Sequence, residues 1–408
     1  MVRVRKSILI ILVVAALICG AVLTFFAVRQ DWLPIKNYIF KGETTTLTQE
    51  EYEEYQYLQK TYSKMDFLKN YIVENYYKDV DEDALMTGAY KGLFEGLNDP
   101  YSAYLTESQF RQLMQDSAGE YSGIGVTITP DSNGYILILA VTEGAPASQA
   151  GIRPGDYILA VDGVEYSGEE YDIAATHMRG KAGTDVVVTI YRDGRQFDVT
   201  LTRATIITET VFWKMLDDQT GYINVTSFDE NTGDHFYKAL TEIEKAGAKK
   251  FVLDLRDNGG GLVDVCLDIA DALIDNATVI YVEDNQGHRE YYNASKGRTS
   301  MKYVVLVNEY SASATEILSA GIQDNAEATI VGVKTYGKGI IQTCDELTDG
   351  TGVKLTILQY FSPSGNTIHG VGITPDYIVE LEDDAYDENG ELVNDIQLDK
   401  ALQILKNQ

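Results

Sequence analysis

The sequence predicts a mixed α+β protein in which an N-terminal transmembrane helix and a helical region precede a small β-sandwich-like domain and an α/β core. Three observations lead there: an apolar run at residues 7–28, helical periodicity from Thr48, and strands that alternate with helices from Thr210 onward. The 408 residues suffice for two or three domains. The predicted segments are a cytoplasmic N-terminus (1–6), a membrane anchor (7–28), a linker (29–47), a helical region (48–117), a β-rich domain (118–205), an α/β core (206–385) and a tail helix (386–408).

The predicted anchor is the uninterrupted apolar run SILIILVVAALICGAVLTFFAV at residues 7–28, which is long enough to cross a bilayer. Arg3, Arg5 and Lys6 precede it, so the positive-inside rule places the N-terminus in the cytoplasm and the chain after Arg29 outside the cell membrane. A cleaved signal peptide is the alternative. Because the run is long for such a peptide and no A-x-A site follows, we expect a retained single-pass anchor.

Charge and cysteine usage exclude several classes of partner. A net charge of −29 disfavours nucleic acid and anionic lipid as partners of the exported part. Cys266 and Cys344 are the only cysteines outside the apolar run, too few for a disulfide framework or a thiolate metal site. The four histidines lack metal-ligand spacing. We therefore expect neither a metal nor a cofactor.

The region after the linker is predicted to be helical from Thr48 to about residue 115, because apolar residues recur there at three- and four-residue steps. The sequence LNDP at residues 97–100 breaks the pattern, and a further helix starts near Glu107. Packing against a second copy and packing on the same chain both fit this pattern. We expect a homodimer through the helical ends.

Short strands separated by glycine turns follow between residues 121 and 203. The predicted elements are a strand that begins at 123–128, a short helix within 144–151, and strands at 157–161, 186–191 and 197–201. The dipeptides Asp162-Gly163 and Asp193-Gly194 are hairpin signals. These features predict a small β-rich domain.

The order GAPASQAGIRPGDYILAVDG at residues 144–163 resembles the interior of a PDZ domain. The resemblance implies that Ser122, Gly123, Ile124 and Gly125 form a carboxylate-binding loop. The backbone N–H groups of such a loop capture a peptide C-terminus, while the next strand pairs with the peptide. A PDZ-like fold that binds no peptide is the alternative.

Strands and helices alternate in the core, which predicts a mainly parallel sheet covered by helices. The expected strands are 221–225, 251–255, 303–307, 329–333, 339–344 and 353–361. The expected helices are 234–246, one that follows residues 258–261 and ends near Ile274, one from the 311–316 block to about Asp324, and a tail helix at 395–405.

Residues 311–316 (SASATE) open a helix directly after a buried strand. Ser313 would lie near the positive end of that helix, a position that suits a nucleophile, and the Ala314 N–H would point to where an oxyanion forms. Ser313 and Glu316 also match a capping box, so a purely structural serine explains this stretch by itself.

Residues 337–342 (GKGIIQ) read as a strand, on which Lys338 and Gln342 share one face because they are four apart. The glycine and isoleucine neighbours would desolvate the amine and lower the pKa of Lys338 from about 10.4 toward neutrality, as a general base requires. Gln342 would then hold the amine in place. An ordinary surface lysine is the alternative.

Two glycine-containing blocks remain. Residues 258–261 (NGGG) follow a buried strand and favour an anion-binding nest of backbone amides, or a flexible turn. Residues 332–338 spell G-x-x-x-x-G-K, the first part of a nucleotide-binding loop. Gly339 stands where the magnesium-binding hydroxyl would be required, so nucleotide binding is disfavoured.

Together these blocks resemble the carboxy-terminal processing peptidases, also called tail-specific proteases, from about Leu68 to Val379. The family usually has phenylalanine where this chain has Tyr336, and serine where it has Thr315. The blocks that carry the resemblance are 88–93 (GAYKGL), 99–105 (DPYSAYL), the PDZ core, 254–261 (DLRDNGGG), 311–316, 323–324, 336–339 (YGKG) and 372–376 (GITPD).

The resemblance implies a serine endopeptidase that recognises protein C-termini through the PDZ domain, cleaves extracytoplasmic proteins through an acyl-enzyme, and needs no cofactor. Ser313 would be the nucleophile, Lys338 the general base and Gln342 its partner. A tethered protein that binds tails without cutting them is the alternative.

The same resemblance assigns the accessory residues. The oxyanion hole would use the amides of Ala314 and of a glycine in the triple, with Gly261 favoured over Gly260. Arg179 is similar to an arginine that couples the position of the PDZ domain to the active site.

Overall fold

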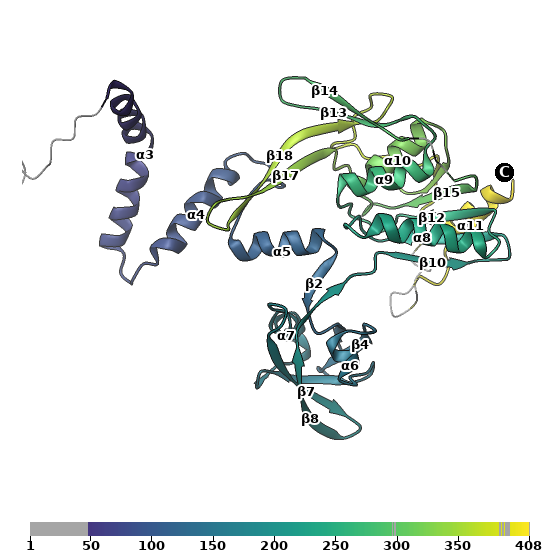
Figure 1. The fold of residues 1–408 in the computed structure, drawn as a ribbon, viewed down its shortest axis with the longest axis horizontal. Coiled ribbons are helices and arrows are strands. Elements are labelled where there is room, and N and C mark those ends of the chain that lie inside the picture. Colours follow the sequence, from purple (N-terminus) through teal and green to yellow (C-terminus); the bar gives the residue numbers. More distant parts are fainter. Residues whose placement is uncertain are drawn as a thin grey trace, which may run out of the picture. The chain divides into compact units, whose positions relative to one another are not determined.

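The computed structural model describes residues 48–295, 297, 299–382, 385, 387 and 392–407 (Figure 1). The predicted anchor at 7–28 lies outside these residues. Within them, no helix combines the length and the apolar character that a membrane crossing needs. The chain divides into one unit that ends at Leu85 and a second that begins at Met86.

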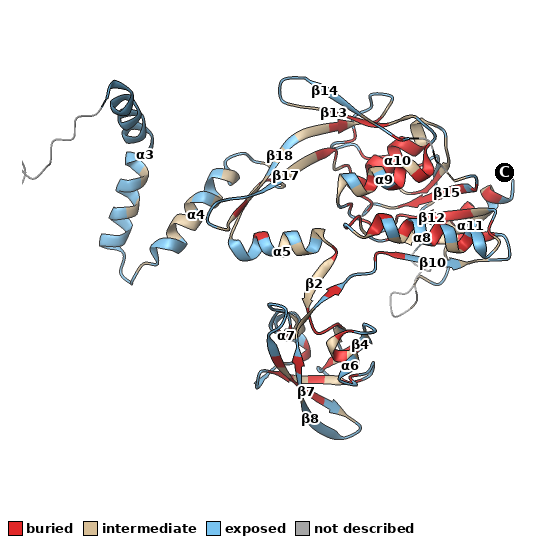
Figure 2. Ribbon diagram, in the orientation of Figure 1, coloured by how far each residue is buried: buried red, intermediate tan, exposed pale blue. Residues whose placement is uncertain are grey.

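In the first unit, helix α3 (Gln49–Asn75) forms where the sequence predicts it. Thr48 caps its N-terminus: the Thr48 N–H donates to the Glu51 carboxylate at 2.7 Å, and the Glu51 N–H donates to the Thr48 hydroxyl at 3.3 Å. The helix ends at Tyr76, where the backbone becomes extended. None of its residues is buried, as the exposed colouring along α3 shows (Figure 2).

Helix α4 (Glu82–Glu95) is followed by the predicted break, strand β1 (Ala103–Leu105) and helix α5 (Glu107–Ser117). Strand β1 was not predicted, since three residues carry no readable periodicity. Thr106 and Gln109 form the capping box of α5. Phe110 of α5 is buried where Gly352 lies, and a Cβ at Gly352 would be 2.1 Å from the Phe110 ring. Close packing therefore joins α5 to the core.

The β-rich region has its own hydrophobic core and a sheet in the order β3-β4-β5-β7-β8. A separate pair, β2 with β9, flanks it in the sequence. The elements are β2 (Glu120–Gly123), β3 (Val126–Pro130), β4 (Ile136–Val141), α6 (Pro146–Gln149), β5 (Tyr157–Val161), β6 (Val164–Glu165), η1 (Gly168–Glu170), α7 (Tyr171–Met178), β7 (Asp185–Arg192), β8 (Arg195–Thr202) and β9 (Ala204–Ile207).

The core contains a six-stranded sheet in the order β10-β11-β12-β15-β16-β19, parallel except for β10. The predicted alternation of strands and helices is confirmed. The elements are β10 (Val211–Met215), β11 (Thr220–Val225), α8 (Thr232–Lys245), β12 (Lys250–Asp254), α9 (Val263–Leu273), β15 (Lys302–Val307), α10 (Ala314–Asp324), β16 (Thr329–Gly332), β19 (Tyr377–Ile378) and α11 (Ile396–Lys406).

Helices cover both faces of this sheet (Figures 1 and 2). Alternate residues of β15 point to opposite faces, as a strand requires. Val305 and Val307 pack in the cluster that includes α8, α9 and α10, whereas Val304 and Leu306 pack against α11. Strand β15 is therefore buried on both sides, and the loop that leaves it toward α10 starts from a rigid base.

A second sheet of the core is antiparallel, in the order β1-β18-β13-β14, with β17 also paired to β18. Its strands are β13 (Thr278–Glu283), β14 (Arg289–Asn293), β17 (Ile340–Glu346) and β18 (Gly352–Phe361). A separate antiparallel sheet was not predicted, because strands 339–344 and 353–361 were assigned to the parallel sheet. Residues 337–339 lie outside β17, which corrects the prediction of a strand from Gly337.

Candidate active site

Ser313 lies at the turn between the buried strand β15 and helix α10, as predicted. Its φ of 57° is positive, which is rare for a residue with a Cβ and marks a strained turn. The Glu316 N–H donates to the Ser313 carbonyl at 2.8 Å, and the Ser313 N–H donates to the Glu316 carboxylate. Glu316 thus forms the capping-box contact with Ser313 that the sequence predicts.

The carboxylate of Glu316 joins the Ser313 turn to the Lys338 loop. Its Oε2 accepts the N–H of Ser313 at 3.0 Å and the N–H of Lys338 at 2.8 Å. Its Oε1 accepts the Thr335 hydroxyl at 2.6 Å and the Gly337 N–H at 2.8 Å. Glu316 is fully buried, so all four donors depend on it. Two blocks 25 residues apart in the sequence are thus brought to one oxygen atom.

Tyr360 of β18 provides a second link between the same two segments. Its phenol oxygen lies 3.0 Å from the Ser313 carbonyl oxygen and in short contact with the Lys338 carbonyl oxygen, so these two acceptors share its single proton. Its ring is fully buried, and its own N–H donates to the Gly339 carbonyl at 3.0 Å. Burial raises the pKa of Tyr360 well above its ordinary value, so the phenol stays a donor at every physiological pH.

The glycine triple packs directly against the Ser313 turn. A Cβ at Gly260 would lie 2.7 Å from the Ser313 Cβ and 3.0 Å from the Ala314 nitrogen. The Gly260 N–H already donates to the Asn258 side chain at 2.8 Å. In the described part of the chain, the N–H groups of Ala314 and Gly261 have no acceptor. These are the two amides that the sequence favoured for an oxyanion hole.

Asn258 holds the glycine loop to the Ser313 turn. Its carbonyl accepts the Ala312 N–H at 3.0 Å and the Thr315 hydroxyl at 2.9 Å. Its fully buried side chain donates to the Val225 carbonyl at 2.9 Å. The threonine that replaces the usual serine at 315 therefore still supplies a buried hydroxyl.

Lys338 is half-buried, and its side chain lies near both charged and aromatic groups. Burial of the amine is the largest cause that lowers the pKa of Lys338, and the positive charge of Lys354 is the second. Asp99, Cys344 and Glu316 act in the opposite direction. The direction of the shift is the one that a lysine general base requires.

Gln342 does not meet Lys338 in the way the strand argument assumed. Strand β17 begins at Ile340, after Lys338, and a bulge between Ile341 and Gln342 interrupts the alternation of side chains. The Gln342 amide donates to the Thr356 hydroxyl at 3.4 Å. Among the described residues, no hydrogen bond joins Gln342 to the Lys338 amine, so its role stays a prediction.

The loop from Gly332 to Lys338 also differs from a nucleotide-binding loop in its surroundings. It leads from β16 into strand β17, whereas phosphate-binding loops of this pattern open a helix. A Cβ at Gly339 would lie 2.2 Å from the His369 nitrogen, so the glycine serves close backbone packing. This arrangement disfavours nucleotide binding on structural grounds as well.

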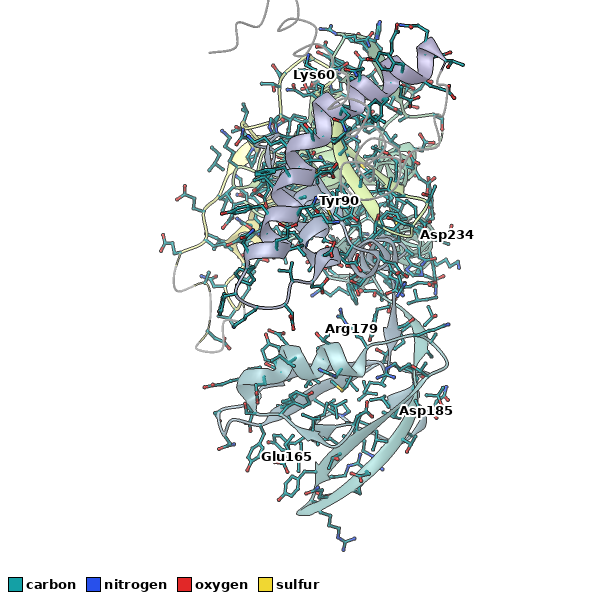
Figure 3. All side chains as sticks on the ribbon, turned by 90° about the vertical axis from the view of Figure 1, so that its left-hand side faces the viewer. Lys60, Tyr90, Glu165, Arg179, Asp185 and Asp234 are labelled. Carbon is teal, nitrogen blue, oxygen red and sulfur yellow. The ribbon has the colours of Figure 1, made fainter. Side chains whose placement is uncertain are left out.

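The predicted carboxylate-binding loop lies at one side of a cavity of about 550 Å³, whose other side is formed by α7. Ile124 is buried, its carbonyl accepts the Ala147 N–H at 2.9 Å, and Gly125 has a φ of 79°. Arg179 directly follows α7 (Figure 3), and its guanidinium lies 5.6 Å from the centroid of the Tyr121 ring. Residues 123–125 thus line a groove between a strand and a helix, as peptide capture requires, whereas Ser122 lies in β2 and is not part of the lining.

Sequence reasoning did not find the linking roles of Glu316 and Tyr360. Glu316 was read only as a capping residue. A signal was present, because a carboxylate in the otherwise apolar helix segment ATEILSAGI needs buried partners. Tyr360 carried no such signal, since a tyrosine in an apolar strand is common.

Comparisons with known proteins identify the parts of this chain. The family model described as Peptidase family S41 matches residues 219–379, that of the PDZ domain matches 122–202, and that of the activating protease CtpB N-terminal domain matches 17–109. The carboxy-terminal processing protease CtpA of Bacillus subtilis is 37% identical over 325 residues, which cover 79% of this chain and 70% of the relative.

Two further comparisons agree. The carboxyl-terminal-processing protease of Synechocystis is 39% identical over 293 residues, 70% of this chain and 68% of the relative. A putative S41 protease from Bacteroides fragilis, 16% identical, shares the fold with a TM-score of 0.52 over 78% of this chain and 90% of its own.

An S41 peptidase core and a PDZ domain in one chain define a serine-type peptidase. The chain belongs to the carboxy-terminal processing peptidases. The mixed fold expected from the sequence, with a PDZ domain beside an α/β peptidase core, is confirmed.

Proposed function

We propose that this protein is a membrane-anchored endopeptidase that captures protein C-termini in its PDZ domain and cleaves extracytoplasmic proteins with Ser313, Lys338 and Gln342. One observation carries the proposal: a single buried oxygen of Glu316 accepts the amides of both Ser313 and Lys338. A nucleophile and its base must be adjacent, and this oxygen holds their main chains together.

In the proposed reaction, the neutral amine of Lys338 takes the proton of the Ser313 hydroxyl, whose oxygen attacks the peptide carbonyl. The amides of Ala314 and Gly261 receive the oxyanion, since neither has an acceptor among the described residues. The amine returns the proton to the leaving nitrogen, and water then hydrolyses the acyl-enzyme. The 3.4 Å bond of Gln342 to Thr356 is long and weak, so its amide is free to turn to the amine.

The test compares the full chain in detergent with its Ser313→Ala variant on an unfolded protein substrate. Mass spectrometry should find products from the wild type and only background from the variant, because the residual rate without a nucleophile is orders of magnitude lower. If Ser313→Ala cuts as well as the wild type, the proposal fails. Intact substrate with saturable tail binding by both would favour a non-cleaving tail-binder.

Lys354→Met is expected to move the acidic limb of the pH profile of kcat/KM to higher pH, by roughly half to one unit. The active form has a neutral Lys338, so activity rises with pH through the pKa of Lys338. The positive charge of Lys354 lowers that pKa, and its removal raises it. Lys354→Arg keeps the charge and serves as the control. Identical limbs for the two variants would show that Lys354 does not act on Lys338.

The membrane part of the proposal rests on the apolar run at 7–28 and the basic residues before it. The full chain should then stay in the membrane fraction during an alkaline carbonate wash, and a protease added outside should reach the PDZ domain. Release of the intact full chain by that wash would contradict the anchor.

We also infer that two copies associate through the helical region. Leu58, Tyr62, Leu68 and Ile72 lie on α3, and between 37% and 49% of each side chain is exposed. A second copy would cover these side chains. Sedimentation of the full chain in detergent should give a dimer, and a Leu58→Glu, Leu68→Glu variant should give a monomer. A wild-type monomer at every concentration would refute the dimer.

A further inference from the structure

The amine of Lys338 packs against an aromatic ring from a distant part of the sequence. Its Nζ lies 5.0 Å from the centroid of the Tyr101 ring, within the range of about 6 Å for a cation–π contact. Tyr101 precedes β1 and is half-buried. The mechanism proposed above gives this ring no role.

The segment that carries Tyr101 is fixed to the antiparallel sheet. The Asp99 carboxylate accepts the Tyr101 N–H at 3.0 Å and the Ser102 hydroxyl at 2.6 Å. The Ser102 hydroxyl in turn accepts the Thr356 N–H of β18 at 2.9 Å. Immediately after it, β1 pairs with β18 from Ala103 onward. The backbone of Tyr101 is therefore held in place.

The phenol of Tyr101 lies close to that of Tyr336. The interaction with the Tyr336 side chain is the largest cause that raises the pKa of Tyr101, to about 12. The Tyr336 N–H donates to the Ser311 carbonyl at 3.0 Å, so its backbone is anchored beside the nucleophile turn. Tyr336 is 60% exposed and stands where the family usually has phenylalanine. Its phenol gives Tyr101 a partner that a phenylalanine could not provide.

We propose that Tyr101 is a positioning residue for the Lys338 amine, and that the neighbouring phenol of Tyr336 helps to hold the ring against that amine. The inference rests on the proposed function, in which Lys338 is the base. The ring restricts where Nζ can move and keeps water from one side of it. In the structure the Tyr101 ring contacts the amine, and among the described residues no hydrogen bond joins Gln342 to it.

Four charged or titratable groups around Lys338 also affect the pKa of its amine. They are Asp99 before β1, Glu316 on α10, Cys344 on β17 and Lys354 on β18. Substitutions at Tyr101 leave these four groups in place. A shift in the titration of Lys338 would therefore report the ring itself.

The first experiment compares Tyr101→Leu with Tyr101→Phe in the full chain. Leucine keeps apolar bulk over the amine but lacks the π face that favours the ammonium. The acidic limb of kcat/KM should therefore move about half a pH unit to lower pH in Tyr101→Leu and stay in place in Tyr101→Phe. With the amine less restricted, kcat of Tyr101→Leu should fall about tenfold with little change in KM.

The second experiment tests whether the Tyr336 phenol helps to hold the Tyr101 ring. Tyr101→Phe and Tyr336→Phe each remove one of the two interacting phenols, so each should lower kcat by about three- to tenfold, and the double variant should be no slower than the slower single one. Tyr104→Phe is the matched control. Tyr104 lies on β1, and the centroid of its ring is 5.2 Å from that of the Tyr90 ring. It should keep the wild-type kcat.

A third readout does not depend on cleavage. Competitive acetylation of the full chain across pH, followed by peptide mass spectrometry, gives the titration midpoint of the Lys338 amine directly. A midpoint that Tyr101→Leu leaves unchanged overturns the inference, as do fully additive effects of the two phenylalanine variants. A Ser313→Ala protein that still cleaves overturns the proposed function instead, and the acetylation result remains readable. Tyr336→Phe changes an exposed side chain and should fold normally. Its kcat can therefore still be measured if Tyr101→Leu does not fold.

Discussion

Glu316→Gln is expected to lower kcat at least about a hundredfold and to reduce the free energy of unfolding by about 2–4 kcal/mol. The carboxylate receives four hydrogen bonds, two on each oxygen, and all four donors lie in the segments around Ser313 and Lys338. Glutamine has one acceptor oxygen, and its NH₂ group would face two donors. Two buried donors would lose their partner, and the Ser313 turn would separate from the Lys338 loop.

Peptide cleavage kinetics and urea unfolding measure the two parts of this result. Glu309→Gln is the matched control, since Glu309 is exposed on the loop that leads to Ser313. It should stay within about 0.5 kcal/mol of the wild type and retain full activity. A Glu316→Gln protein with wild-type kcat would mean that the shared carboxylate does not position the reacting groups.

Gly260→Ala is expected to lower kcat by about 10²–10³, similar to the loss of an oxyanion donor, and to destabilise the fold by roughly 1–3 kcal/mol. The new methyl group would lie 2.7 Å from the Ser313 Cβ and 2.8 Å from the Ala312 carbonyl oxygen. The φ of 104° is also unfavourable for alanine. The glycine loop and the Ser313 turn would have to move apart.

The neighbouring Gly259→Ala variant controls for this effect. A Cβ at Gly259 meets no atom within 4 Å, and its φ is not positive. Its kcat and its thermal unfolding midpoint should therefore match the wild type. Equal losses in both variants would show that the loop tolerates no side chain for a reason other than its contact with Ser313.

The sequence was sufficient to predict elements with strong local signals. The strand from Tyr157 to Val161 has the predicted bounds, and the helix that begins within the 311–316 block ends at Asp324 as predicted. In both cases a buried apolar run is flanked by turn residues. The PDZ domain was predicted from a long ordered motif. The roles of Ser313 and Lys338 were predicted from a resemblance, and Glu316 and Tyr360 explain why the main chains of these two residues lie together.

The antiparallel sheet and the surroundings of Lys338 could not be predicted in this way. Lys338 contacts Tyr101, more than 200 residues earlier in the chain. Strand β1 joins that sheet through only three pairs, with Lys354, Val353 and Gly352. Such contacts depend on side-chain packing between distant segments, which leaves no period in the sequence. The bulge before Gln342 also has no recognisable signal in the local sequence. Because it interrupts the alternation of side chains, the prediction that Lys338 and Gln342 share one face of a strand does not hold.

Ser313 follows a strand of the parallel sheet, whereas Lys338 precedes a strand of the antiparallel sheet. Tyr360 of the antiparallel sheet contacts the Ser313 turn. The proposed activity therefore depends on how the two sheets pack against each other, since neither sheet alone holds both Ser313 and Lys338. A slide of one sheet past the other by about an ångström would move the Lys338 loop relative to the Ser313 turn while leaving each sheet intact. A ligand that binds the outer strands and shifts one sheet would therefore change activity without contacting Ser313 or Lys338.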